Sequence, residues 1–73
     1  MNYGAHGHMD YSKLWALMER VHINKLYLRQ NGIHPNTLGK LKRNENITTE
    51  IICKLCQILQ CQPGDIMEYK AED

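Results

Sequence analysis

The segment from His34 to Arg43 carries the side chains best suited to chemistry. Leu38 and Leu41 would share one face of a helix here, which leaves the polar residues on the opposite face. In duplex DNA an asparagine amide can pair with adenine, a lysine with guanine, and a threonine methyl group can meet the methyl group of thymine. The pattern therefore predicts a helix that reads base edges. Its predicted base contacts are His34, Asn36, Thr37, Gly39 and Lys40.

Positive charge is concentrated in the middle of the chain, although the formal net charge is only +1. Between Arg20 and Arg43 there are six basic residues and no acidic one, whereas positions 45 to 73 hold six acidic residues and two lysines. This polarity directs one side of a domain towards a polyanion and keeps the other side away from it. The uneven distribution of charge therefore favours a nucleic-acid partner. The alternative is that the basic residues are only a run of charges solvated by water.

Two helices joined by a tight turn would hold the polar face in place. A turn at residues 31–34 separates the two helices, and Gly32 supplies the left-handed backbone that such a turn needs. Helices that begin at Asn24 and Thr48 would direct backbone N–H groups at phosphates beside the reading helix. The predicted phosphate contacts are Asn24, Lys25, Arg29, Lys42, Arg43 and Thr48.

Apolar side chains recur at three- and four-residue intervals, and no segment alternates with a period of two. An apolar residue precedes each predicted cap and can pack on another one five positions later. These caps are Asn24, His34, Thr48 and Gln62. The predicted helices cover residues 10–21, 24–30, 35–42, 48–60 and 63–68. The expected fold is a compact all-α domain of five helices without strands.

Cys53, Cys56 and Cys61 have a spacing that resembles a set of metal ligands. The first two lie in an apolar helical segment, where cysteine commonly behaves as a small buried hydrophobe, and no nearby histidine or fourth cysteine completes a tetrahedral site. The odd number of cysteines and the lack of an export signal predict reduced thiols. We therefore predict no metal site and no cofactor.

No combination of residues predicts catalysis. His22 and His34 each stand alone, no glycine-rich phosphate loop is present, and 73 residues offer little concavity for a substrate. The aromatic residues are scattered over separate elements, and Trp15 is expected to be a core or interface anchor. The chain is therefore predicted to be a binding protein and not an enzyme.

The chain is long enough for a single domain, which we expect at residues 9–73. Residues 1–8 are rich in Gly and His and precede Met9, so they are interpreted as an expression-vector remnant, with a disordered native arm as the alternative. No apolar run approaches the roughly 18 residues of a membrane span. We expect a soluble protein of the cytoplasm, with no membrane partner.

From about Leu14 to Tyr69 the sequence resembles the Cro/phage-repressor family of helix-turn-helix regulators, also called lambda-repressor-like or XRE, and in particular its short bacterial Cro-like members. The segments GIHPNTL at 32–38, NEN at 44–46 and CQPGDIMEY at 61–69 carry the resemblance. It implies a five-helix domain whose third helix reads operator DNA, usually as a homodimer. It also implies a bacterial protein that is associated with the nucleoid when bound. Leu28 departs from the family, which usually has a small residue there, and should alter how the second and third helices pack.

The expected function is sequence-specific binding of double-stranded DNA by a transcriptional regulator, either a repressor or an autoregulator. A homodimer could form through Ile66, Met67 and Tyr69, although these residues could instead close the core. The alternative is a protein-interaction or antitoxin-like adaptor domain with a helix-turn-helix fold. The acid-free stretch favours the regulator, because an adaptor has no reason to exclude acids from the surface that would face phosphates.

Overall fold

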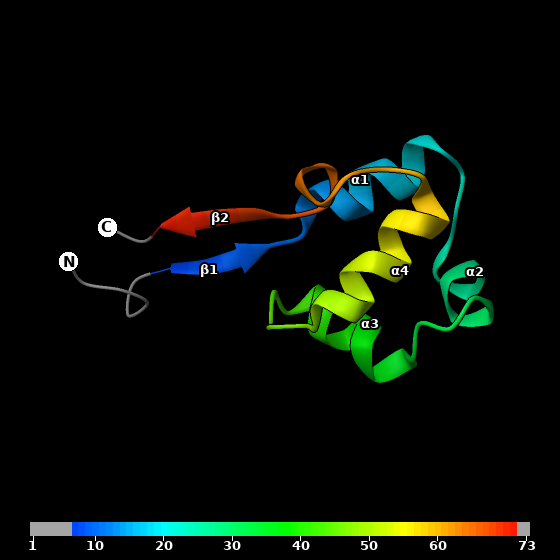
Figure 1. Ribbon diagram of the computed structural model, residues 1–73, viewed down its shortest axis with the longest axis horizontal. Coiled ribbons are helices and arrows are strands. Elements are labelled where there is room, and N and C mark those ends of the chain that lie inside the picture. The colour runs from blue at the N-terminus through cyan, green and yellow to red at the C-terminus, as the bar shows by residue number, and fades with distance from the viewer. Residues whose placement is uncertain (1–6, 72–73) are drawn as a thin grey trace.

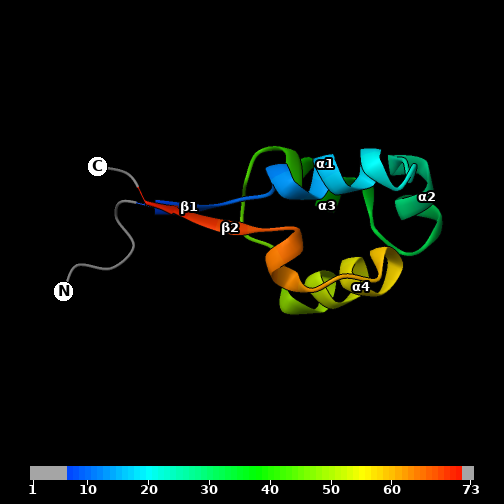
Figure 2. The same ribbon diagram turned by 90° about the horizontal axis from the view of Figure 1, so that it is seen from above.

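A computed structural model describes residues 7–71 of the chain. Its elements are β1 (Gly7–Asp10), α1 (Ser12–Arg20), α2 (Lys25–Gln30), α3 (Pro35–Lys42), α4 (Thr49–Leu59), the short 3-10 helix η1 (Pro63–Asp65) and β2 (Glu68–Ala71). The helices form one body, and the two strands extend from it as a narrow ribbon (Figure 1). A perpendicular view shows the same projection of the ribbon (Figure 2).

Side-chain caps begin α2, α3 and α4. Asn24 Oδ1 accepts the backbone N–H of Tyr27 at 2.9 Å, and His34 Nδ1 accepts that of Asn36 at 3.0 Å. Thr48 Oγ1 accepts the N–H three residues later at 3.2 Å. Each cap satisfies a donor that has no partner within the first turn of its helix. The three caps predicted at these positions are therefore confirmed.

One apolar core joins the helices. Its buried members are Tyr11, Leu14, Leu17, Met18, Leu28, Ile33, Leu38, Leu41, Ile52, Leu55, Leu59 and Ile66. Ile33 precedes the cap of α3 and is 1% exposed, so the turn before this helix is anchored in the core. Leu28 is fully buried, so the residue that departs from the family pattern takes part in the packing between α2 and the rest of the body.

The turn between α2 and α3 depends on Gly32, whose φ is 99°. This left-handed conformation is open to glycine and costly for residues with a Cβ. The backbone N–H of Ile33 donates to the carbonyl oxygen of Leu28 at 3.0 Å, which closes the end of α2 before the chain enters α3. The predicted helix-turn-helix is confirmed, with α2 and α3 as its two helices.

The expectation of five helices without strands was wrong. β1 and β2 form a two-stranded antiparallel sheet with Gly7 opposite Ala71 and Asp10 opposite Glu68. The expected helix at 63–68 is a single 3-10 turn, after which Ile66 turns into the core and the chain continues as a strand. The strands pair residues from opposite ends of the chain, and such a pairing leaves no local periodicity in a four-residue segment.

The ribbon has an apolar face and a charged face because side chains alternate along each strand. Met9 lies opposite Tyr69 in the register, and a methyl group at Gly7 would collide with the ring of Tyr69. Gly7 and His8, which fall within the expected remnant at 1–8, belong to β1, while residues 1–6 lie outside the described part of the chain. Within residues 7–71, none of the helices has the length and apolar character required to cross a bilayer.

Candidate nucleic-acid interface

The helix α3 presents its polar side to solvent because its apolar side is buried. Leu38 is 6% exposed and Leu41 is fully buried, so the rest of the helix surface faces outward. Among the predicted base contacts, His34, Asn36 and Lys40 are exposed, and Thr37 and Gly39 are half-buried. These five predicted residues therefore occupy one helix and its cap, with three exposed to solvent and two partly covered.

His34 has a defined hydrogen-bonding role. Its Nδ1 accepts the backbone N–H of Asn36, so the neutral imidazole carries its proton on Nε2. The cap therefore leaves an N–H donor on the exposed edge of the ring. A base acceptor or a phosphate oxygen can accept from this group.

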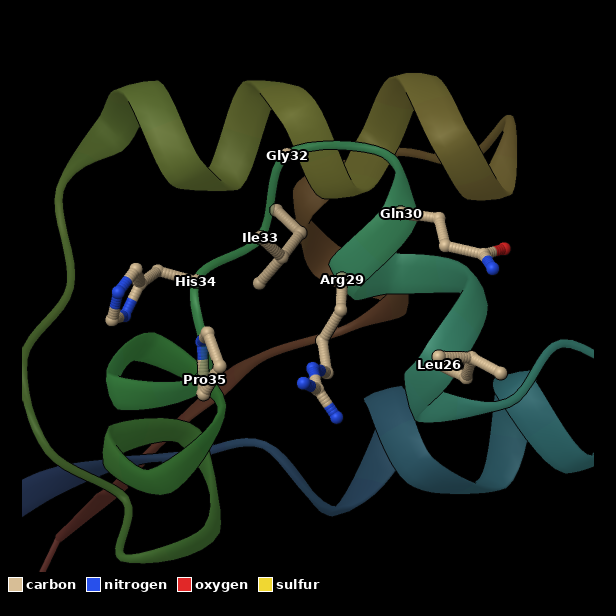
Figure 3. A pocket seen from close by; sticks show the side chains of 7 residues that line it. All are labelled: Leu26, Arg29, Gln30, Gly32, Ile33, His34 and Pro35. Carbon is tan, nitrogen blue, oxygen red and sulfur yellow. The ribbon is translucent and has the colours of Figure 1, made fainter.

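A hollow of about 450 Å³ lies between α2 and the start of α3. Figure 3 shows Arg29, from α2, and His34, from the cap of α3, among the side chains that line it. Leu26, Ile33 and Pro35 provide the apolar part of the lining. The hollow brings together one residue predicted to contact phosphate and one predicted to contact a base.

Arg43 is tied to a neighbour that the sequence analysis did not use. Its Nε forms an ion pair with Glu45, and both side chains are largely exposed. The hydrogen bond that Arg43 donates to the Glu45 carboxylate raises the pKa of Arg43 and lowers the pKa of Glu45. The guanidinium also lies along α3, since a methyl group at Gly39 would be 3.2 Å from Arg43 Nη1. A phosphate at Arg43 would therefore compete with Glu45.

Lys25 and Lys42 come from different helices of the candidate interface. Lys25 is the first residue of α2 and Lys42 the last residue of α3. The Lys42 amine lowers the pKa of Lys25. Lys25 Nζ also lies 5.3 Å from the centroid of the Trp15 ring. Trp15, expected as an anchor, packs partly against the core and also meets a predicted phosphate contact.

Asn24 and Thr48 are exposed, but their side-chain oxygens serve as helix caps. The amide N–H₂ of Asn24 and the hydroxyl hydrogen of Thr48 are the donors that these side chains retain. Both residues therefore have a defined role in the fold whether or not they meet a phosphate.

Two residues that position the end of α3 were missed by sequence reasoning. Asn44 adopts a left-handed conformation with a φ of 57°, and its Oδ1 accepts the backbone N–H of Tyr11 at 3.1 Å. Tyr11 Oη donates to the carbonyl oxygen of Glu45 at 2.8 Å. These two bonds attach the segment after α3 to the start of α1. An asparagine after a helix, which tolerates left-handed backbone, was the available signal.

The three cysteines are not grouped with other possible metal ligands in the described part of the chain. In the part of the chain that the structure describes, no group of three or more His, Cys, Asp or Glu side chains is placed to hold a metal ion. Cys53 is exposed, and Cys56 and Cys61 are half-buried. Burial, with the neighbouring Cys56, raises the pKa of Cys61 to about 11. Its thiol therefore stays protonated at neutral pH.

Comparisons with known proteins support the same interpretation. A family model described as the Cro/C1-type HTH DNA-binding domain matches residues 9–72. The chain is similar to a solved structure titled "Crystal structure of transcriptional regulator VanUg, Form II", with a TM-score of 0.88 and 33% identity over 99% of this chain and 97% of the other. A search of curated protein sequences gave no significant match. The chain therefore belongs to the Cro/C1-type helix-turn-helix family of DNA-binding domains.

Proposed function

We propose that this chain is a transcriptional regulator that binds duplex DNA with α3 in the major groove. The observation that carries the proposal is the exposed polar face of α3, which holds no acidic residue and lies opposite the buried Leu38 and Leu41. The similarity to a protein titled a transcriptional regulator supports the regulatory role. A helix of this kind fits the width of the major groove.

Asn36 and Lys40 are the proposed principal base readers. They lie one helical turn apart on α3, and both are exposed, so they can reach neighbouring base pairs. His34, Thr37 and Gly39 complete the proposed reading surface. His34 would donate from Nε2, while the half-buried Thr37 and Gly39 would allow close approach of the helix to the groove.

The phosphate contacts proposed around this helix are Asn24, Lys25, Arg29, Lys42, Arg43 and Thr48. All six are exposed; Lys42 is the last residue of α3, and the other five lie before or after this helix in the sequence. Lys25, Arg29 and Lys42 are the strongest of them, because no carboxylate pairs with them among residues 7–71. Cationic side chains that replace condensed counterions supply most of the sequence-independent affinity for DNA.

We further propose that the protein acts as a homodimer on a two-fold symmetric operator. Of the three C-terminal residues expected at the interface, Ile66 is fully buried and Met67 packs against the core, whereas Tyr69 is 61% exposed. Tyr69 and the ribbon are therefore the part of this segment that a second copy could reach. Sedimentation with and without DNA tests this: a monomer under both conditions would contradict it.

Selection from random duplex DNA tests the proposed function directly. We expect enrichment of one short motif, with two inverted half-sites if the dimer is correct. A single unrepeated half-site would support base reading by a monomer. Failure to enrich any motif would instead favour the protein-interaction or adaptor function.

A further inference from the structure

Two of the three cysteines lie at the C-terminal end of α4. Gln60, the residue after the helix, has a left-handed backbone with a φ of 51°. The backbone N–H of Cys61 donates to the carbonyl oxygen of Cys56 at 3.0 Å. These features form a Schellman motif, in which the side chains of the two hydrogen-bonded residues commonly contact each other. The motif therefore favours contact between the Cys56 and Cys61 side chains.

The backbone hydrogen bond limits the distance between these two cysteines. With standard bond lengths, the N–O distance of 3.0 Å allows the Cα atoms of Cys56 and Cys61 to be at most about 6.9 Å apart. Any bend along the connecting atoms brings them closer. Disulfides in proteins usually join Cα atoms that are about 4.4 to 6.8 Å apart. The folded backbone therefore places the two residues within reach of a disulfide.

Both cysteine side chains line the same hollow at the end of α4, which has a volume of about 570 Å³. Cys56 and Cys61 are half-buried, and both pack against the core. Their thiols are therefore held by packing and still border a space that a small solute can enter. Cys53 is exposed and does not line this hollow.

Cys53 is a poorer partner for Cys56. The two residues are three positions apart within α4, and side chains at this spacing on a helix have Cβ atoms about 5 to 6 Å apart. The Cβ atoms of a disulfide are only about 3.5 to 4.5 Å apart. A bond between Cys53 and Cys56 would therefore distort the helix, whereas Cys61 lies beyond its end.

We propose that Cys56 and Cys61 are a redox-modification site, which a low-molecular-weight disulfide such as oxidised glutathione converts into an intramolecular disulfide. The bond would join the last turn of α4 to the segment that leads through η1 to the buried Ile66. It would lie at the opposite end of α4 from Thr48, the nearest of the proposed phosphate contacts in the sequence. The proposal goes beyond the proposed DNA binding and does not depend on it.

The bond would form by two thiol–disulfide exchanges. Burial raises the pKa of Cys61 to about 11, so few of its thiols are ionised at pH 8 and the first attack comes from Cys56. The Cys56 thiolate attacks one sulfur of oxidised glutathione and releases one glutathione thiolate. Cys61 then loses its proton, and its sulfur attacks Cys56 Sγ and releases the second glutathione. Two protein thiols are oxidised to one disulfide, and one oxidised glutathione is reduced to two thiols.

Peptide mapping tests the proposal on the wild-type chain. The folded, reduced protein is incubated with oxidised glutathione at pH 8, its remaining thiols are blocked with N-ethylmaleimide, and it is digested with trypsin. Cleavage after Lys54 separates Cys53 from peptide 55–70, which contains both Cys56 and Cys61. We expect this peptide to lose two hydrogens and to carry neither glutathione nor maleimide. The peptide with Cys53 should carry one of these groups.

Serine variants provide matched controls, and circular dichroism first establishes that each is folded. Cys53→Ser should form the same disulfide as the wild-type chain, because this residue is not part of the pair. Cys56→Ser and Cys61→Ser should each carry glutathione or maleimide on the remaining cysteine of peptide 55–70. A linkage between Cys53 and Cys56 in the wild-type chain, or a peptide 55–70 that does not lose two hydrogens, would overturn the proposal.

Urea denaturation tests whether the folded backbone accommodates the bond. A disulfide that fits the native geometry stabilises the folded state by restricting the unfolded chain. We expect the oxidised wild-type chain to unfold at a higher urea concentration than the reduced chain, and dithiothreitol to reverse this shift. An unchanged or lower midpoint would overturn the proposal, because the bond would then form at the expense of the native geometry. None of these measurements uses DNA, so a failure here leaves the proposed function unaffected.

Discussion

At the scale of single residues, the candidate DNA contacts differ in whether another side chain of the protein already binds them. Asn36 and Lys40 project from α3 towards solvent. Arg43, by contrast, is paired with Glu45, and its guanidinium lies along the helix. Residues of the first kind can read bases without rearrangement, whereas Arg43 must exchange one anionic partner for another.

Substitution of Asn36 should separate base reading from backbone binding. Asn36→Ala removes a possible bidentate contact with adenine and should cost about 1 to 3 kcal/mol on the preferred sequence, with little change on scrambled DNA. Lys42→Ala, the comparison variant, should weaken binding to both DNAs alike. Titration of each variant against both duplexes measures this difference. Equal losses on both DNAs for Asn36→Ala would contradict its role as a base reader.

Removal of the Glu45 carboxylate should strengthen DNA binding. Glu45→Gln frees Arg43 for a phosphate and removes a negative charge beside it, so we expect about a threefold or greater gain in affinity at low salt. Glu19→Gln is the control, because it makes the same charge change on α1. Fluorescence anisotropy with labelled duplex measures both. Equal gains for the two variants would show that net charge, and not the release of Arg43, is responsible.

The thiols should react with iodoacetamide at different rates. The pKa of Cys61 is raised to about 11 by burial and by Cys56, so its reactive thiolate is scarce below that pH. At pH 8 we expect only about one Cys61 in a thousand to be ionised, and the exposed Cys53 to be alkylated first. Peptide mass spectrometry over time checks the order. Alkylation of Cys61 before Cys53 would contradict the burial of its thiol.

At the scale of elements, a short turn and a set of caps determine how α3 is presented. Gly32 allows the chain to reverse direction after α2, Ile33 anchors the turn in the core, and His34 caps α3. Tyr11 and Asn44 attach the segment after α3 to α1. Both ends of α3 are therefore fixed by contacts with residues outside this helix.

Substitution of Gly32 by alanine should destabilise the fold by straining the backbone, without a steric clash. A methyl group there would lie 3.7 Å from Lys54 Nζ, an ordinary contact, but the φ of 99° is unfavourable for alanine. We expect Gly32→Ala to lower the free energy of unfolding by about 1 to 2 kcal/mol. Gly64→Ala is the control, since its methyl group would meet nothing within 4 Å. Urea denaturation compares them, and equal stability of the two variants would rule out strain at Gly32.

At the scale of the whole molecule, charge is divided between a basic middle and an acidic end. The basic part includes α2 and α3, and six of the eight acidic residues lie after α3 in the sequence. Such a division of charge would orient the domain before it contacts DNA, and would make the affinity for DNA depend on ionic strength. The ribbon of β1 and β2 extends from the helical body and adds Tyr69 as an exposed aromatic residue (Figure 1).

The affinity for duplex DNA should therefore fall steeply as salt is added. If about four phosphates are neutralised per protomer, the logarithm of the binding constant should fall against the logarithm of salt concentration with a slope of roughly −3 to −4. Titrations at several sodium chloride concentrations measure this slope. A slope near zero would mean that the basic face does not meet DNA.

The sequence by itself determined the helices α1 to α4 and the helix-turn-helix, because these depend on neighbours a few residues apart. Apolar spacing marked the buried faces, and Asn24, His34 and Thr48 marked the starts of three helices. Gly32 marked the turn, because the left-handed backbone that a turn requires is also a local property of the chain. The exposed face of α3 followed directly, since the positions of Leu38 and Leu41 define the side that must point inward.

Only the tertiary structure decided which distant residues meet. The pairing of β1 with β2 joins the two ends of the described chain, and no local pattern encodes it. The approach of Lys25 to the ring of Trp15 likewise depends on how α1 and α2 pack, not on the spacing of the two residues in the sequence. Such contacts are set by the common core, because close packing of large apolar side chains fixes the position of every helix relative to the others.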